Sequence, residues 1–201
     1  MEPNSTTENR IKEAARKIFI KKGLAGARMQ EIADEAKINK AMLHYYYRNK
    51  EQLFKKIFEE VAAEFVPKIF SILGEDRPLE VKVQDFVSHY LDMLTRNPFL
   101  PLFVLSELRS QPEFFENAVG IKRSGILEKL AVQLKAEAKA GHIKPISPAN
   151  FMANLMSLSI FPFLAQPMLQ LIFSMNTQEF KNFIEERKQL IPQFIMSSLK
   201  T

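Results

Sequence analysis

The stretch MQEIADEAKINKAMLHYYYRNKEQLF, from Met29 to Phe54, decides the fold of the first quarter of this 201-residue chain. Its first half carries apolar residues at helical spacing, which predicts a short helix over about residues 29–36: Met29, Ile32, Ala33 and Ala36. Asn39 is a good N-cap, and Ile38 and Leu43 stand where a hydrophobic staple places its two apolar residues. The stretch therefore predicts a second helix of about two turns, ending near residue 48.

Longer helices flank this pair. The residues before it form one apolar stripe that ends at Gly23, a typical helix stop: Ile11, Ala14, Ala15, Ile18 and Phe19. A fourth helix begins at Lys50 and carries another stripe: Leu53, Phe54, Ile57, Phe58, Val61 and Phe65. Further helices are predicted over about residues 83–94, 99–110, 113–140, 148–175 and 177–199. The chain is therefore expected to be all-α, with about nine helices.

Composition narrows the class of protein. With 46% hydrophobic and 25% charged residues, the chain resembles an ordinary globular protein. It has no Cys, which excludes disulfides, thiolate metal sites and a cysteine nucleophile. The N-terminus is polar and then amphipathic, so no signal peptide is expected and a cytoplasmic location follows.

The positive charge is concentrated at the N-terminus. Residues 1–50 hold 11 Lys and Arg against 6 Asp and Glu, whereas residues 51–201 hold 17 of each, so the first segment carries the whole net charge of +5. A basic head on a neutral body suggests a polyanionic partner for the head. An excess of this size is also compatible with chance.

The side chains of three consecutive tyrosines, Tyr45 to Tyr47, point in three different directions from the second short helix. Leu43 and Tyr47 lie on one face, which we expect to pack inward. Ala41 and Tyr45 point the opposite way, and Tyr46 leans to the side. The residues flanking the outward face are Lys40, Met42 and His44. Two short helices, the second with exposed aromatic and basic residues, form a helix-turn-helix pattern that is typical of DNA readers.

Residues 7 to 61 resemble the DNA-binding domain of TetR/AcrR-family transcriptional repressors. The resemblance is carried by RIKEAARKIFIKKG, from Arg10 to Gly23, by the stretch quoted above and by the long helix after it. It implies a helix-turn-helix DNA-binding domain at residues 1–50 and a helical ligand-binding and dimerisation domain at residues 51–201. The implied function is that of a homodimeric repressor, released from a pseudo-palindromic operator by a small ligand.

The resemblance also assigns DNA-binding roles. Tyr46 and Lys50 fall on phosphate-binding positions of the family, and Gln30 falls on a position that reaches the groove. Recognition-helix positions are occupied by Lys40, Ala41, Met42, His44 and Tyr45. Three residues depart from the family pattern: His44 replaces the commoner tyrosine, Ala41 the usual glycine, and Arg28 a capping Thr or Ser. Arg28 is added to the set because it supplies a phosphate-seeking cation.

The same resemblance implies that the segment 148–199 forms a four-helix bundle with a second copy. It also implies a pocket inside the body, and the abundance of Phe and Met suggests a hydrophobic inducer. The expected lining residues are Phe65, Phe86, His89, Tyr90, Phe103, Glu107, Met156 and Phe161. Phe and Met at helical spacing are also what an ordinary core contains. No cofactor and no metal are expected.

Two other classes of function stay open at this stage. No charge occurs between Lys144 and Glu179, and an apolar run of that length could span a bilayer. Polar residues and the prolines Pro162 and Pro167 argue against insertion, so no membrane partner is expected. An enzyme is the weaker alternative, because the three His residues lack metal-ligand spacing and no nucleophile motif or phosphate-binding glycine loop is present.

Overall fold

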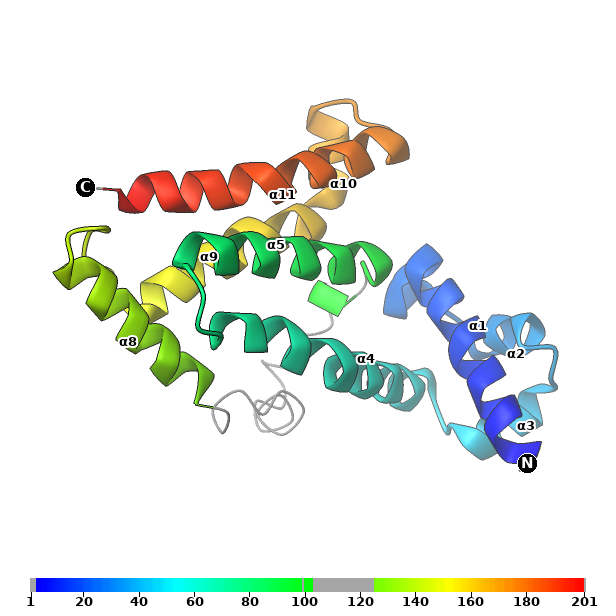
Figure 1. Cartoon of the computed structure of the whole chain (residues 1–201). Coiled ribbons are helices and arrows are strands. Elements are labelled where there is room, and N and C mark those ends of the chain that lie inside the picture. Colours follow the sequence, from blue (N-terminus) through cyan, green and yellow to red (C-terminus); the bar gives the residue numbers. More distant parts are fainter. Residues whose placement is uncertain (1–2, 99, 103–124, 201) are drawn as a thin grey trace. The chain divides into compact units, whose positions relative to one another are not determined.

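The computed structural model describes residues 3–98, 100–102 and 125–200 (Figure 1). All regular elements in this part are α-helices, which confirms the all-α class. They are α1 (Pro3–Gly26), α2 (Met29–Glu35), α3 (Lys40–Tyr46), α4 (Lys50–Leu73), α5 (Leu79–Arg96), α8 (Ile126–Lys139), α9 (Pro148–Leu164), α10 (Gln166–Ile172) and α11 (Thr177–Leu199). The expected helix over 99–110 and the first part of the one over 113–140 lie mostly outside the described residues.

The chain forms two compact units, Met1–Ala63 and Glu64–Thr201. The division falls inside α4, because Leu53, Phe54 and Ile57, in its first turns, are buried in the core of the N-terminal unit. The domain boundary that the resemblance implies, at residue 50, stays a prediction. The Phe54 ring meets that of Phe19 on α1 edge-on, with centroids 4.7 Å apart.

The N-terminal unit buries the stripes that the sequence predicts. Ile11, Ala15 and Phe19 on α1 are fully buried, as are Ile32 and Ala33 on α2 and Leu43 on α3. The regular part of α1 ends at Gly23, where φ is +66° and the backbone leaves the helical region. Few residues other than glycine adopt that conformation readily, which explains why this glycine marks the stop.

The turn between α2 and α3 is a Schellman motif with Lys37 in the left-handed conformation, at φ 55°. The Ile38 amide donates to the Ala33 carbonyl, and the Lys37 amide donates to that of Asp34. Arg10 on α1 donates to the carbonyls of Ala36 and Lys37, so the turn is fixed to the first helix. The Asn39 side chain then caps α3 by accepting from the Met42 amide at 2.7 Å.

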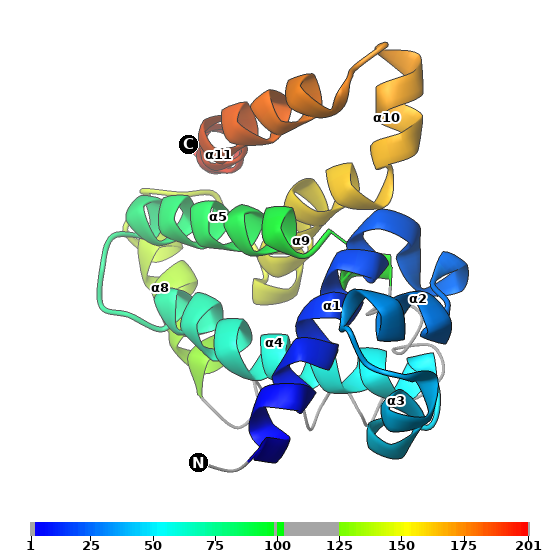
Figure 2. The same ribbon diagram turned by 90° about the vertical axis from the view of Figure 1, so that its right-hand side faces the viewer.

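In the C-terminal unit α5 packs against both α9 and α11, and the three helices lie alongside one another in both ribbon views (Figures 1 and 2). The helix expected over 148–175 is wrong in its extent. It ends at Leu164, and α10 continues from Gln166 at a bend of 69°. Pro167 occupies the first turn of α10, the position where a missing amide proton costs no helical hydrogen bond.

Tyr47 joins the end of α3 to α1. Only 8% of its surface is exposed, and its hydroxyl donates to Glu8 Oε1 at 3.0 Å. Burial, reinforced by this hydrogen bond to Glu8, raises the pKa of the Tyr47 phenol above its ordinary value. The neutral ring therefore acts as both a core residue and a hydrogen-bond donor.

Tyr47→Phe is predicted to lower the free energy of unfolding by about 1 kcal/mol, because one partly buried hydrogen bond is lost while the ring is kept. Urea unfolding followed by far-ultraviolet circular dichroism measures this difference. Tyr45→Phe is the matched control, since that ring is exposed, and it should leave stability unchanged. Equal effects of the two substitutions would contradict the anchoring role of Tyr47.

Candidate functional site

The two faces of α3 differ sharply in exposure. Leu43 and Tyr47 are buried in the N-terminal unit, whereas 82% of the Tyr45 surface is exposed. Lys40, Ala41, Met42 and His44 are exposed with it. The directions predicted from helical geometry are therefore confirmed, and the contacts of these side chains with DNA remain a prediction.

Tyr46 is half-buried and lies beside Tyr45. The two rings meet at 89° with centroids 5.6 Å apart, an edge-to-face pair. This contact limits the motion of the more exposed ring. Tyr45 is thus an aromatic side chain held in place at the surface with most of its area open to a partner.

The His44 ring is oriented by the backbone. Its Nδ1 lies 3.0 Å from the Arg48 carbonyl oxygen. Because a carbonyl oxygen only accepts, this hydrogen bond requires the proton on Nδ1. The neutral ring then offers Nε2 as a hydrogen-bond acceptor at the exposed face of α3. A tyrosine hydroxyl at this position would both donate and accept.

Arg28 and Gln30 are also exposed, at the start of α2. Arg28 occupies the N-cap position with extended backbone and makes no side-chain capping hydrogen bond, as its residue type implies. Gln30 Nε2 donates to Asp34 Oδ1 at 2.8 Å, one turn along the same helix.

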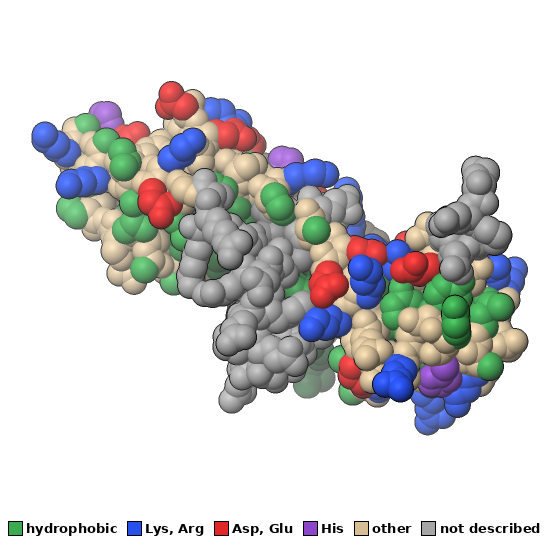
Figure 3. Space-filling view, turned by 90° about the horizontal axis from the view of Figure 1, so that it is seen from below, with side chains coloured by type: hydrophobic (Ala, Val, Ile, Leu, Met, Phe, Trp, Pro, Cys, Tyr) green, Lys and Arg blue, Asp and Glu red, His purple; other side chains and the backbone are tan. Residues whose placement is uncertain are grey.

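Electrostatics favour an anion at this surface. Two of the three carboxylates of α2 are engaged by cations on α1: Lys22 pairs with Glu31 at 2.6 Å, and Lys17 pairs with Glu35 at 3.0 Å. The hydrogen bond from Lys22 lowers the pKa of Glu31. By contrast, no ion pair is shown for Lys40 or Arg48 within the described residues. Lys and Arg side chains gather beside a histidine on this unit (Figure 3).

Lys50, whose phosphate contact remains a prediction, makes hydrogen bonds within its own unit. Its ammonium donates to the carbonyls of Ala25 and Ala27, at 3.1 and 3.3 Å. These bonds tie the start of α4 to the end of α1 and occupy two of its three donors. Lys50 is therefore first a structural tie, with one N–H left for a phosphate.

Five of the expected pocket residues lie among the described residues, and the pocket itself remains a prediction. Phe86 and Tyr90 are buried and pack together, with ring centroids 5.6 Å apart. His89 is exposed on the same helix, Met156 is half-buried on α9, and Phe161 is exposed there. The side chains of Phe65, Phe103 and Glu107 lie outside the described residues.

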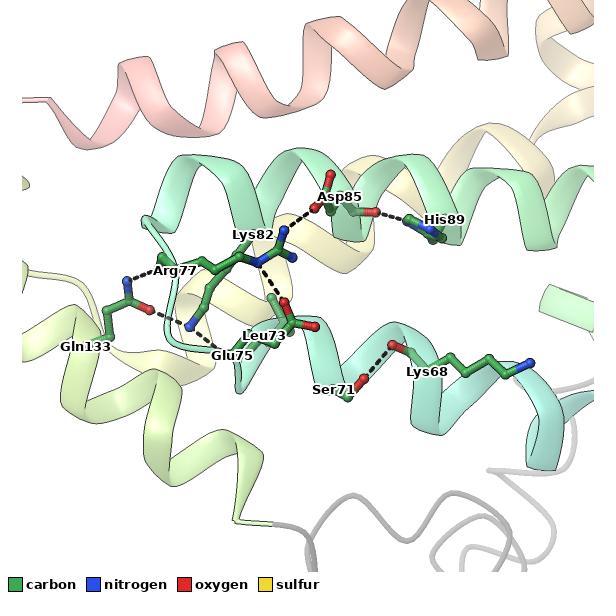
Figure 4. Close-up of polar contacts among 9 residues, drawn as sticks. All are labelled: Lys68, Ser71, Leu73, Glu75, Arg77, Lys82, Asp85, His89 and Gln133. Carbon is green, nitrogen blue, oxygen red and sulfur yellow. Dashed lines mark hydrogen bonds and ion pairs between the residues drawn. The ribbon is translucent and has the colours of Figure 1, made fainter.

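A polar network that the sequence analysis missed lies at the far end of α4 (Figure 4). Lys82 on α5 is almost fully buried, and its Nζ donates to the Leu73 carbonyl at 2.9 Å and to Gln133 Oε1 at 2.7 Å. Gln133 on α8 donates in turn to the Arg77 carbonyl. Burial lowers the pKa of Lys82. The signal was available, because Lys82 occupies a core-facing position in the α5 stripe.

Arg77 completes this network in the loop between α4 and α5. Its guanidinium pairs with Glu75 at 2.6 Å and with Asp85 at 2.8 Å. The contacts of Lys82, Gln133 and Arg77 together join the last turn of α4 to α5 and α8.

An apolar surface runs along α9, α10 and α11. Leu190 and Phe194 on α11 are 53% and 63% exposed, and they line an open groove of about 520 Å³ together with Leu158 of α9. The other large exposed apolar residues of this surface are Phe161, Met168, Leu171, Ile172 and Phe173. Several large apolar residues exposed on neighbouring helices are typical of an interaction site.

Two features of the described residues bear on the alternatives raised by the sequence. No single helix there is both long and apolar enough to cross a bilayer, although α9 and α10 together reach the required length and composition across their 69° bend. No group of three or more His, Asp or Glu side chains in the same residues is placed to hold a metal ion.

Comparison with known proteins identifies the N-terminal helices. The family model for bacterial regulatory proteins of the tetR family matches residues 11–57. NicS, an HTH-type transcriptional repressor of Pseudomonas putida, is 32% identical over 92 residues, which are 46% of this chain and 43% of NicS. The HTH-type transcriptional repressor SCO4008 of Streptomyces coelicolor is 46% identical over 54 residues, 27% of this chain and 28% of the repressor. The chain thus matches less than half of the length of each.

The fold extends the likeness to the whole chain. The transcriptional regulator FadR of Bacillus subtilis, solved in complex with stearoyl-CoA, superposes with a TM-score of 0.62 over 94% of this chain and 98% of FadR, at 17% identity. These named relatives are regulators rather than enzymes. The family model covers the helices that carry the exposed face of α3, so residues 11–57 are a helix-turn-helix domain of the tetR family of bacterial regulatory proteins, and beyond them the fold is similar to that of a transcriptional regulator.

Proposed function

We propose that this protein is a cytoplasmic, homodimeric repressor that binds a pseudo-palindromic operator through α3 and releases it when a hydrophobic ligand binds. The observation that carries the proposal is the outward face of α3. Its aromatic, apolar and basic side chains have no core to join, while Leu43 and Tyr47 hold the opposite face in place. A helix fixed in this way fits the major groove.

Each residue of the surface has a role in this proposal. Ala41 and Met42 offer apolar contacts to thymine methyl groups, and Lys40 and His44 offer polar contacts to base edges. Tyr46, Arg48 and the remaining N–H of Lys50 bind phosphates beside the start of α4, where the helix dipole also favours an anion. Arg28 and Gln30 extend the contact surface at the start of α2.

The apolar surface of α9 and α11 supports the proposed dimer. On α11 the half-buried and exposed residues of one face recur at spacings of four and three: Phe183, Arg187, Leu190, Phe194 and Ser197. Alternating spacings of this kind form the seam of packed helix pairs. Two copies joined through segment 148–199 would present two α3 helices about one helical turn of DNA apart, roughly 34 Å, to a pseudo-palindromic site.

Ligand release acts through α4, which is one continuous helix with residues in both units. Its last turn is held by Lys82, so a ligand that favours a different arrangement of α4, α5 and α8 also displaces α4. Such a ligand shifts the equilibrium only by its difference in affinity for the two arrangements. Phe86 and Tyr90 belong to the aromatic cluster nearest to this network on α5.

Lys40→Ala and Tyr45→Ala are each predicted to weaken operator binding by about tenfold, because each removes one contact to DNA. Fluorescence anisotropy with DNA from upstream of the protein's own gene measures this loss. The affinity of the unmodified protein should fall steeply as salt is raised, since its cations displace counterions from phosphates.

Lys135→Ala, which removes an exposed lysine from α8, is the matched control and should bind like the unmodified protein. The proposal fails if all three variants bind alike, or if the unmodified protein prefers its upstream DNA no more than a scrambled duplex at every salt concentration.

A long-chain acyl compound is the first ligand to test, because a structural relative is known in complex with stearoyl-CoA. Stearoyl-CoA at about 100 times its dissociation constant would stabilise the protein by roughly 2.7 kcal/mol and raise its Tm. Free CoA should leave Tm unchanged, since it lacks the apolar chain. If neither stearoyl-CoA nor stearate changes Tm or operator affinity, a long-chain ligand is excluded.

A further inference from the structure

The hydrogen bond between His44 and the end of its own helix limits what this side chain can do at the DNA surface. Because the Arg48 carbonyl, 3.0 Å from Nδ1, only accepts, the proton of the neutral ring is on Nδ1. The ring is exposed, and within the described residues no second hydrogen bond or ion pair is shown for it. At pH 8, where histidine is ordinarily neutral, Nε2 is therefore an acceptor and not a donor.

The polar groups around His44 leave this acceptor open to a partner. Lys40 lies one helical turn before His44 on the same side of α3, and both side chains are exposed. A lysine only donates, so α3 presents a donor and an acceptor side by side. The carboxylates of α2, which packs against α3, are engaged by other side chains: Glu31, Asp34 and Glu35.

Duplex DNA offers few partners to a group that only accepts. The phosphate oxygens are acceptors, and so are guanine N7 and O6, adenine N7 and thymine O4 in the major groove. The donors that the major groove presents are the exocyclic amino groups, N4 of cytosine and N6 of adenine. A direct hydrogen bond between the neutral His44 ring and the groove must therefore involve one of these two amino groups.

We propose that His44 is a specificity residue whose Nε2 accepts a hydrogen bond from an exocyclic amino group of the operator, cytosine N4 or adenine N6. The inference rests on the proposed function and adds the kind of base that this residue reads. In both kinds of base pair an acceptor lies beside the amino group, guanine O6 or thymine O4, and either one suits the neighbouring ammonium of Lys40. A tyrosine at position 44 would instead be able to donate to a phosphate, so the two residue types are not equivalent there.

Base analogues that lack only the amino group test this contact without altering the protein. In one half-site of the operator, each cytosine is replaced in turn by 2-pyrimidinone and each adenine by purine, and affinity is measured by fluorescence anisotropy at pH 8. We expect one position at which the analogue weakens binding by about fivefold, which corresponds to one neutral hydrogen bond. The base replaced at that position tells whether the amino group belongs to cytosine or to adenine.

His44→Ala then shows whether the lost contact is that of His44. At the position found, this variant should bind the natural and the analogue operator equally, because its acceptor is absent. His44→Gln, which keeps an acceptor, should recover part of the difference. His89→Ala is the matched control, since His89 is an exposed histidine of α5 with Nδ1 2.7 Å from the Asp85 carbonyl, and it should keep the full difference.

The outcomes separate this inference from the proposed function. An unmodified protein that prefers its upstream DNA no more than a scrambled duplex overturns both. If that preference is present, the inference alone is overturned when no analogue weakens binding, or when an analogue weakens His44→Ala as much as the unmodified protein. It is also overturned if His44→Ala loses the same affinity for natural, analogue and scrambled duplexes, because that pattern belongs to a phosphate contact.

Discussion

The burial of Leu43 and Tyr47 is the constraint on which the rest of the N-terminal unit depends. A helix of seven residues has little stability of its own, so α3 exists because this face is packed against its neighbours. The Asn39 cap and the Tyr47–Glu8 hydrogen bond fix its two ends. Because the face of Leu43 and Tyr47 is packed in the core, the other residues of α3 must face solvent. The three tyrosines therefore have three environments: Tyr47 is in the core, Tyr46 is half-buried and Tyr45 is open to a partner.

The helix-turn-helix unit could be predicted closely because its information is local. Caps, glycine stops and apolar stripes determine α1 to α3 over a few residues, and no distant contact overrides them. Lys50 shows the limit of such reasoning. Its place at the start of α4 indicated a phosphate contact, but the carbonyls that it holds, at Ala25 and Ala27, come from a helix end that only the tertiary structure brings near.

The C-terminal unit was less predictable for the same physical reason. Hydrophobic periodicity located α5 and α11, but an apolar run on all sides could not show that the chain turns by 69° at Ala165. Hydrophobic periodicity also could not distinguish core residues from pocket residues. Of the expected pocket residues on α9, Met156 is half-buried and Phe161 is exposed. Lys82 shows a further limit, because a lysine is usually exposed, whereas this one lies in the buried α5 stripe. Its bonds to Leu73 and Gln133 explain how a lysine is accommodated there.

The central claim is that the exposed face of α3 lies in the major groove of two adjacent half-sites. It is tested most directly by attaching a DNA-cleaving iron chelate to Tyr45→Cys, the only thiol in the variant chain. We expect cleavage of the operator in two short patches whose centres lie about one helical turn, roughly 34 Å, apart. Cleavage spread evenly along the duplex, or absent while the protein is bound, would show that α3 is not the element that reads DNA.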